Sequence, residues 1–192
     1  MERSKDMKAV LIGILSLMLS TAAMANDFGL VVGVRSNSAD TPSSGVTVSA
    51  KTGLGVGAMG YFDFAPKWEM RTGFVYNQRN FTLTASGIDI DLNLSYVDIP
   101  VTANYKFADY AGVFAGPVLA LLVSKDCKVS GGTCTLTSSP DSMSVGLQFG
   151  ATFKFAPQVG GEFYYQTIPS EFWKSTLQNA RTVGASLLIT FE

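Results

Sequence analysis

The sequence of residues 142–155, SMSVGLQFGATFKF, alternates between two chemically different faces. One face is apolar, and the positions between its members are small or polar; the apolar face consists of Met143, Val145, Leu147, Phe149, Ala151, Phe153 and Phe155. A period of two is typical of a β-strand, whose successive side chains point to opposite faces of the sheet. The run is too long for an ordinary globular strand of about five or six residues. It suits a tilted strand of about 9 to 11 residues that crosses a bilayer and projects beyond it.

Seven further segments alternate in the same way, at residues 28–36, 53–64, 68–78, 96–107, 111–124, 159–166 and 182–191. Short connections (65–67, 108–110, 156–158) alternate strictly with long, polar ones (37–52, 79–95, 125–141, 167–181). Both chain ends therefore fall on the short-turn side, as in outer-membrane barrels. Because backbone polar groups in hydrocarbon must pair within the protein, strands with a lipid-facing side must close into a ring. The sequence predicts an all-β fold: an eight-stranded antiparallel up-and-down transmembrane β-barrel.

Aromatic side chains support this orientation. Six of them fall on the apolar parity at the strand ends next to short turns or termini: Phe28, Phe64, Trp68, Phe107, Phe155 and Phe191. A belt of aromatic residues at the membrane interface is typical of such barrels. One segment is less regular, because Leu92 and Leu94 lie on the opposite parity from Val97 and Ile99. A β-bulge near Ser95 or Tyr96 would bring them onto one face.

The same parity assigns eight charged side chains to the interior: Arg35, Asp63, Glu69, Arg71, Asp98, Lys106, Lys154 and Glu162. These four positive and four negative charges balance, and buried charges are tolerated only when they are paired and hydrogen-bonded. We therefore predict a charged network that closes the lumen. Replacing Glu69 by alanine should then strand a buried cation and cost about 3 kcal/mol or more. Passage of protons or ions along this row is the alternative.

The stretch at 53–64, GLGVGAMGYFDF, contains the spacing G-x-G-x-x-G found in dinucleotide-binding folds. That motif binds a pyrophosphate only where the glycine turn opens a helix, and here Pro66 and a turn follow instead. The nucleotide interpretation fails. As part of a strand, the glycines at 53, 55 and 57 face inward and leave room in a narrow barrel for large side chains such as Arg35, Arg71 and Tyr164.

The N-terminal residues predict export. Basic residues precede an apolar stretch that ends in Ala23-Met24-Ala25, which is typical of a cleaved secretory signal peptide at residues 1–25. The mature barrel would then span 26–192, and Asn26 in place of a cysteine argues against a lipid anchor. Removal of three basic residues from 14 and two acidic ones from 15 leaves 11 and 13, a net charge of −2. Nucleic acid is excluded as a partner, because phosphate binding needs clustered positive charge.

The two cysteines, Cys127 and Cys134, flank a Gly-Gly turn. In an exported chain this spacing favours a disulfide that closes a small loop, with two unpaired thiols as the alternative. The chain contains no histidine, and two sulfurs alone do not make a zinc site. We expect no metal, no cofactor and no catalytic residues.

Two adjacent stretches carry a resemblance to a known family. The sequences YVDIPVTANYKF (96–107) and YAGVFAGPVLALLVS (110–124) are similar to the acidic-Ile-Pro strand and the Gly-Pro-containing next strand of small eight-stranded outer-membrane barrels of the PorT-like, OmpX-like or OmpA-domain group. One departure is Glu192, which follows Phe191 where such barrels usually end on an aromatic residue. The resemblance implies a monomer in the bacterial outer membrane that contacts lipid and lipopolysaccharide and is inserted by the barrel-assembly machinery.

Four classes of function compete for such a chain. The best supported is a structural or interaction barrel that displays four extracellular loops, with a role in adhesion, envelope integrity or secretion. In its fourth loop Phe172 and Trp173 are candidate contacts for a surface protein or lipopolysaccharide, or they fold back onto the rim. A small passive channel or transporter is the alternative, and a soluble lipocalin-like barrel would require the faces to be inverted. Catalytic barrels of similar size resemble one another in using a histidine, which this chain lacks.

Overall fold

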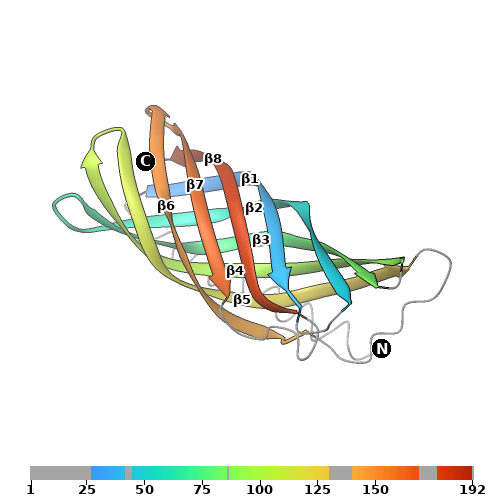
Figure 1. The fold of residues 1–192 in the computed structure, drawn as a ribbon. Coiled ribbons are helices and arrows are strands. Elements are labelled where there is room, and N and C mark those ends of the chain that lie inside the picture. Colours follow the sequence, from blue (N-terminus) through green and yellow to red (C-terminus); the bar gives the residue numbers. More distant parts are fainter. Residues whose placement is uncertain (1–26, 42–44, 86, 130–139, 169–176, 192) are drawn as a thin grey trace, which may run out of the picture.

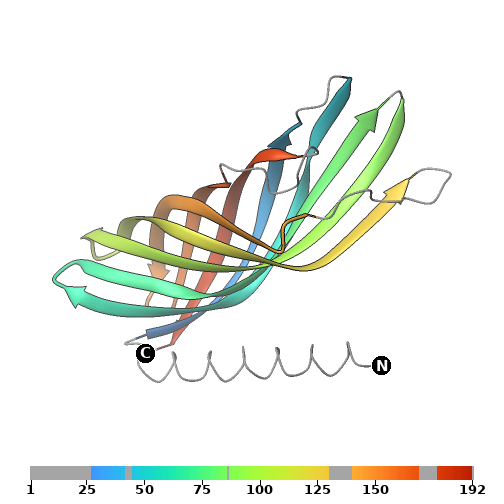
Figure 2. The same ribbon diagram turned by 90° about the horizontal axis from the view of Figure 1, so that it is seen from below.

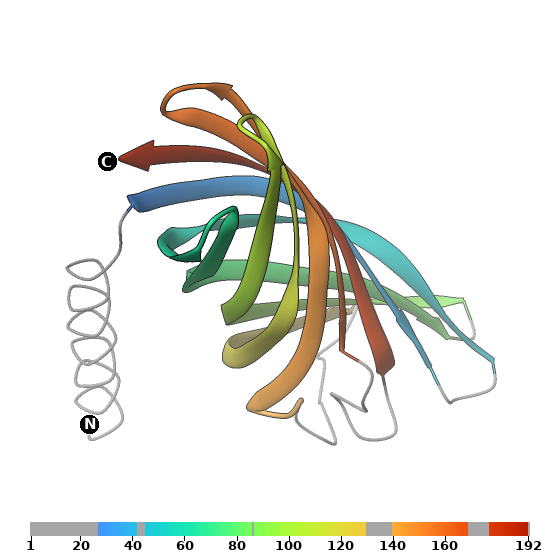
Figure 3. The same ribbon diagram turned by 90° about the vertical axis from the view of Figure 1, so that its left-hand side faces the viewer.

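A computed structural model describes residues 27–41, 45–85, 87–129, 140–168 and 177–191. It contains β1 (Asp27–Asp40), β2 (Val46–Ala65), β3 (Trp68–Ala85), β4 (Ile88–Ala108), β5 (Ala111–Val129), β6 (Met143–Ala156), β7 (Val159–Ile168) and β8 (Gln178–Phe191). Each strand pairs antiparallel with its neighbours in sequence, and β8 pairs with β1 to close the barrel (Figure 1). Viewed toward the short-turn end, the strands follow one another around the ring (Figure 3). The predicted fold is confirmed.

The two faces of the sheet have the predicted chemistry. On β6 the side chains of Met143, Val145 and Leu147 are more than half exposed, whereas Ser144 on the same strand is buried. Aromatic side chains line the short-turn rim: Phe64, Phe107, Phe155 and Phe191 are exposed, and Trp68 lies between Phe64 and Tyr105 with ring centroids 6.3 and 5.0 Å away. No described residue belongs to an apolar helix long enough to cross a bilayer. Apolar side chains facing outward also exclude the inverted, lipocalin-like arrangement.

The short turns lie at one end of the barrel, together with the start of β1 and the end of β8 (Figure 1). They follow β2, β4 and β6, as predicted. Each turn also binds its neighbour, because the backbone carbonyls of Lys67, Tyr110 and Gln158 accept hydrogen bonds of 2.8 to 2.9 Å from the amides of Lys106, Lys154 and Thr190. The backbone groups at this rim are thereby linked from hairpin to hairpin.

The prediction of four long loops at the other end is wrong in its boundaries. The segment 79–95 is almost entirely strand, because β3 continues to Ala85 and β4 begins at Ile88. Likewise β1 reaches Asp40 and β2 begins at Val46. These extensions project beyond the rest of the barrel (Figure 2). Polar composition suggested loops, but outside the bilayer a strand can carry polar side chains on its outer face and keep its hydrogen bonds.

The bulge near Ser95 is present, but on the neighbouring strand. In the β4–β5 ladder Ser95 is opposite Ser124 and Tyr96 is opposite Leu122, so Val123 of β5 is the extra residue. The pairing of β4 with β3 is regular on both sides of this point. Leu92 and Leu94 therefore do not turn toward lipid; both are buried in the interior.

Candidate functional site in the barrel interior

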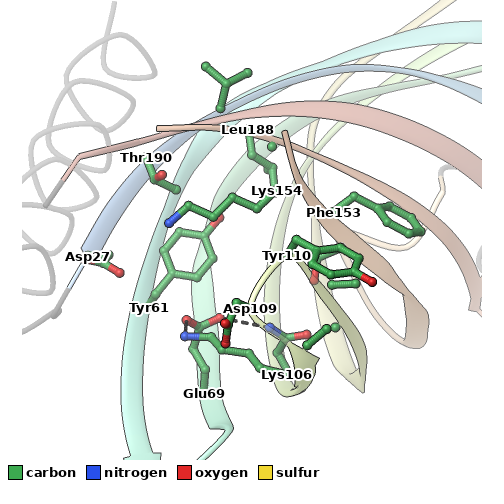
Figure 4. A pocket seen from close by; sticks show the side chains of 17 residues that line it. Asp27, Tyr61, Glu69, Lys106, Asp109, Tyr110, Phe153, Lys154, Leu188 and Thr190 are labelled. Atoms are coloured by element: carbon green, nitrogen blue, oxygen red, sulfur yellow. Dashed lines mark hydrogen bonds and ion pairs between the residues drawn. The ribbon is translucent and has the colours of Figure 1, made fainter. Parts of the chain in front are cut away.

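The inward side chains form successive layers along the barrel, and the first is a pocket at the short-turn end. This mouth pocket has a volume of about 170 Å³ (Figure 4). Lys106 lies in it, with its ammonium 2.7 Å from Glu69 and 3.3 Å from Asp63. Lys106 and Asp63 are 40% and 55% exposed, and Lys154 on the opposite wall is also exposed. Three of the predicted interior charges therefore lie at the mouth instead of in a buried network.

The second layer is a buried ion pair. Arg71 of β3 donates from Nη2 to Oε2 of Glu162 on β7 at 2.5 Å, and both side chains are almost fully buried. The guanidinium also lies over the ring of Phe114, with 4.1 Å to the centroid, and near Tyr61 at 5.8 Å. Two residues 91 positions apart in sequence thus close one cross-section of the interior.

The third layer centres on Asp98 of β4. Arg79 donates from Nη2 to both of its carboxylate oxygens at 2.8 Å, and Asn77 and Gln166 add hydrogen bonds of 2.6 and 3.3 Å. The Arg79 guanidinium lies over the ring of Tyr96, 4.4 Å from its centroid. Arg79 is not among the predicted interior charges, because its segment was predicted to be a loop. The inward-facing residues of β3 have odd numbers. Continuing this alternation from Asn77 to the next odd position would have predicted that Arg79 faces the interior.

Arg35 of β1 differs from the other two buried arginines. It is 3% exposed, yet its Nε and Nη1 have no hydrogen-bond partner and it forms no ion pair within the described residues. The Arg35 guanidinium lies 5.7 Å from the centroid of the Tyr164 ring. The prediction that every interior charge is paired is therefore wrong for Arg35.

Inward glycines accommodate two of these large side chains. A Cβ on Gly55 would collide with the Arg35 guanidinium, as predicted from the sequence. Tyr164, however, lies against Gly184 of β8 instead of a glycine of β2. At Gly53 and Gly57 the colliding atoms would be backbone oxygens of β3, those of Gln78 and Phe74. These two glycines allow close approach of strands more than they make room for side chains.

The fourth layer, toward the long-connection end, is apolar. We call it the apolar layer; its buried members are Phe81, Leu83, Leu92, Leu94, Tyr96, Ala120, Ile168, Leu177 and Ala180. They come from strands β3, β4, β5, β7 and β8 and from Leu177, which directly precedes β8, and they include positions in segments predicted to be loops. Cys127 at the end of β5 packs against this layer and is disulfide-bonded. Cys134 lies outside the described residues, as do Phe172 and Trp173, so the predicted pairing and loop contacts stay predictions.

Ion pairs also brace the outer ends of the strands. Lys51 of β2 donates to Oδ1 of Asp91 on β4 at 2.7 Å, and the Thr82 hydroxyl donates to the same oxygen at 2.8 Å. The hydrogen bond from Lys51, followed by that from Thr82, lowers the pKa of the Asp91 carboxyl below its usual value. Arg181 and Asp40 form a similar pair between β8 and β1 at 2.9 Å.

The sequence matches the outer membrane protein beta-barrel domain family over residues 24–167. The chain belongs to this family, and its place is the bacterial outer membrane. The match does not distinguish between the PorT-like, OmpX-like and OmpA-domain groups.

Solved structures of small outer-membrane proteins have a similar fold. OprG from Pseudomonas aeruginosa has 9% identity and a TM-score of 0.52, covering 88% of this chain and 97% of its own. Neisserial surface protein A has 13% identity and a TM-score of 0.50, covering 85% and 95%. Ail, the attachment invasion locus protein of Yersinia pestis, has 14% identity and a TM-score of 0.47, covering 86% and 100%. No curated protein sequence matches the chain.

Proposed function

We propose that this protein is a non-conducting outer-membrane barrel that holds extended hairpins outside the cell as a structural or interaction surface. The observation that carries the proposal is the filling of the interior by successive layers. The Arg71–Glu162 pair, the Arg79–Asp98 cluster and the apolar layer follow one another along the barrel. An eight-stranded barrel is just wide enough for such side chains to fill.

Ion passage would have to break these layers. A hydrated ion entering from the mouth pocket meets Arg71 and Glu162 first, and separating a buried pair leaves uncompensated charges at a cost of about 3 to 5 kcal/mol. Beyond it the apolar layer offers no polar groups to replace a hydration shell except the Tyr96 hydroxyl. The layers act in series, which favours a closed lumen over a passive channel or transporter.

The outer ends of the strands would be the working surface. In the β3–β4 hairpin the strand pairing extends as far as Ala85 and Ile88, so this hairpin forms a stiff projection. Its outer face carries polar groups such as Thr82, Thr84 and Asp91, with Lys51 from β2 beside them. Such a surface suits contact with lipopolysaccharide or a surface protein, in adhesion, envelope integrity or secretion. This role requires no catalysis.

Channel recording tests the proposal. Refolded protein, shown to be folded by faster migration of the unboiled sample on a gel, is added to planar lipid bilayers beside a porin as the conducting control. We expect no current steps from this protein under conditions in which the porin conducts. Reproducible steps of a uniform size would overturn the closed lumen and favour the channel.

The surface role has its own test. Crosslinking on intact cells, followed by identification of the captured molecules, should recover lipopolysaccharide or a surface protein. Variants Phe172→Ala and Trp173→Ala should reduce the yield if these residues are contacts. An unchanged yield would support the alternative in which they fold back onto the rim.

Processing and assembly complete the proposal. We infer that residues 1–25 are removed during export, that the barrel-assembly machinery inserts the chain, and that it works as a monomer. Mass spectrometry of the purified outer-membrane protein should find Asn26 as its first residue. A protein that retains residues 1–25 in the outer membrane would contradict the cleavage.

A further inference from the structure

A small cavity lies between the second and third layers of the interior, next to Arg35. Its volume is about 20 Å³, more than the about 10 to 15 Å³ that one water-sized occupant needs. The walls include Arg35, Arg71 and Ser186, together with the carboxylates of Asp98 and Glu162. The cavity is therefore polar and has room for a single occupant about the size of a water molecule, which is too small for a polyatomic ion such as sulfate.

Several hydrogen-bond donors around this cavity have no partner among the described residues. They are Nε and Nη1 of Arg35, Nε and Nη1 of Arg71, and the hydroxyl of Ser186. Arg71 already binds Glu162 through Nη2 and lies over Phe114, which accounts for part of its surface. Arg35 has no comparable ion pair in the part of the chain that the structure describes. Unpaired buried donors from two guanidinium groups and a hydroxyl are the groups that bind an anion.

The charges around the cavity do not cancel. Three arginines, at 35, 71 and 79, are buried in the second and third layers, and the carboxylates beside them are Asp98 and Glu162. Glu69, the third buried carboxylate, lies toward the mouth and pairs with Lys106. Within these two layers one positive charge is left over, while at the mouth Glu69 and Asp63 share Lys106. An arginine stays protonated in proteins, so it cannot lose that charge as a buried lysine could.

We propose that the barrel interior contains a binding site for one halide-sized anion, chloride under ordinary conditions, held by Arg35 with the Ser186 hydroxyl and the free side of Arg71. A water molecule could satisfy the same donors but would leave the surplus charge buried, and uncompensated buried charges are costly. The two carboxylates on the wall are neutralised by Arg79 and Arg71, so they do not repel the anion as free charges would.

Stability measurements in different salts test the site. The refolded protein in detergent is unfolded with urea in sodium chloride and in sodium gluconate of the same ionic strength, because guanidinium chloride would supply the anion. A ligand bound only by the folded state lowers the unfolding equilibrium constant by the factor 1 + [L]/Kd, about tenfold when chloride is ten times its Kd. We expect higher stability in chloride and in bromide than in gluconate.

Two variants test whether the chloride-dependent stability arises from this cavity. Arg35→Met removes the surplus charge, so its stability should be the same in both salts. Lys154→Met removes an exposed cation of the mouth pocket, outside the cavity, and should keep the full chloride response. Equal stability of the unaltered protein in both salts, or an undiminished chloride response in Arg35→Met, would overturn the proposal.

Crystals of the unaltered protein soaked in sodium bromide give a readout that does not depend on the variants folding. An anomalous peak within hydrogen-bond distance of Arg35 Nε or Nη1 is expected. Ordered water without bromide at this position would overturn the proposal.

Discussion

Glu162 and Glu69 are both buried carboxylates, but their cationic partners differ in exposure. Glu162 binds Arg71, whose side chain is 2% exposed, whereas Glu69 binds Lys106, which is 40% exposed. Loss of a carboxylate should therefore have different consequences at the two positions. The sequence alone assigned both to one network, because parity shows which side of the sheet a residue faces and not how far along the barrel water reaches.

The first prediction compares alanine variants at these positions. Glu162→Ala leaves the Arg71 charge buried without its partner and should lower the unfolding free energy by about 3 to 5 kcal/mol. Glu69→Ala should cost less than that, about 1 to 2 kcal/mol, since Lys106 can turn to Asp63 and water while the Asn104 amide loses its acceptor. Urea unfolding in detergent measures both. Equal losses would show that Lys106 is buried in the membrane-inserted protein.

The second prediction concerns Gly57 of β2. A methyl group at this position would collide with the backbone oxygen of Phe74 on β3, which cannot move without shifting the strand. Gly57→Ala should therefore destabilise the barrel by about 1 to 3 kcal/mol. Ser49→Ala, an exposed position at the outer end of the same strand, serves as the control with little expected change. A neutral Gly57→Ala would mean that β2 and β3 can separate at this point without loss.

At the scale of elements, the sequence predicted the bilayer-crossing parts of all eight strands but not their outer ends. The alternation of 142–155 and the short turns were sufficient inside the membrane, because lipid selects one fully apolar face. Beyond the membrane the faces exchange chemistry: Phe81 and Leu83 point inward while Thr82 and Thr84 point outward. A sequence pattern judged by its apolar outer face therefore predicts a polar loop in these segments. Arg79 and most of the apolar layer were missed for this reason.

The third prediction tests the brace between β2 and β4. Since hydrogen bonds from Lys51 and Thr82 lower the pKa of Asp91, the folded state favours the carboxylate. The stabilisation is present above the unfolded-state pKa near 3.8 and is lost as the pH falls through the lower, folded-state value. A carbon-detected NMR titration in micelles should place the Asp91 midpoint below 3.8 and move it upward in Lys51→Gln. Both side chains are well exposed, so the effect on overall stability should be small.

At the scale of the whole molecule, the interior contains an apolar layer and layers of paired charges, and these contribute differently to stability and to closure of the lumen. The apolar layer is packed like the core of a soluble protein, so truncating its side chains should lower the free energy of unfolding. The Arg71–Glu162 pair fills space between opposite walls, and a buried pair replaced by apolar groups of similar volume is often neutral. Substitutions should therefore be able to change the stability of the barrel without opening its lumen. In a barrel closed by a single plug, the two properties would change together.

The fourth prediction follows from this division. Phe81→Ala, in the apolar layer, should lower the unfolding free energy by about 3 to 5 kcal/mol, whereas the double variant Arg71→Met, Glu162→Met should remain within about 1 kcal/mol of the unaltered protein or exceed it. Neither should conduct in planar bilayers, because the remaining layers still close the interior. Urea unfolding and single-channel recording on the same refolded samples measure the two properties. Conduction by the double variant alone would show that the ion pair is the gate and that the apolar layer contributes only to stability.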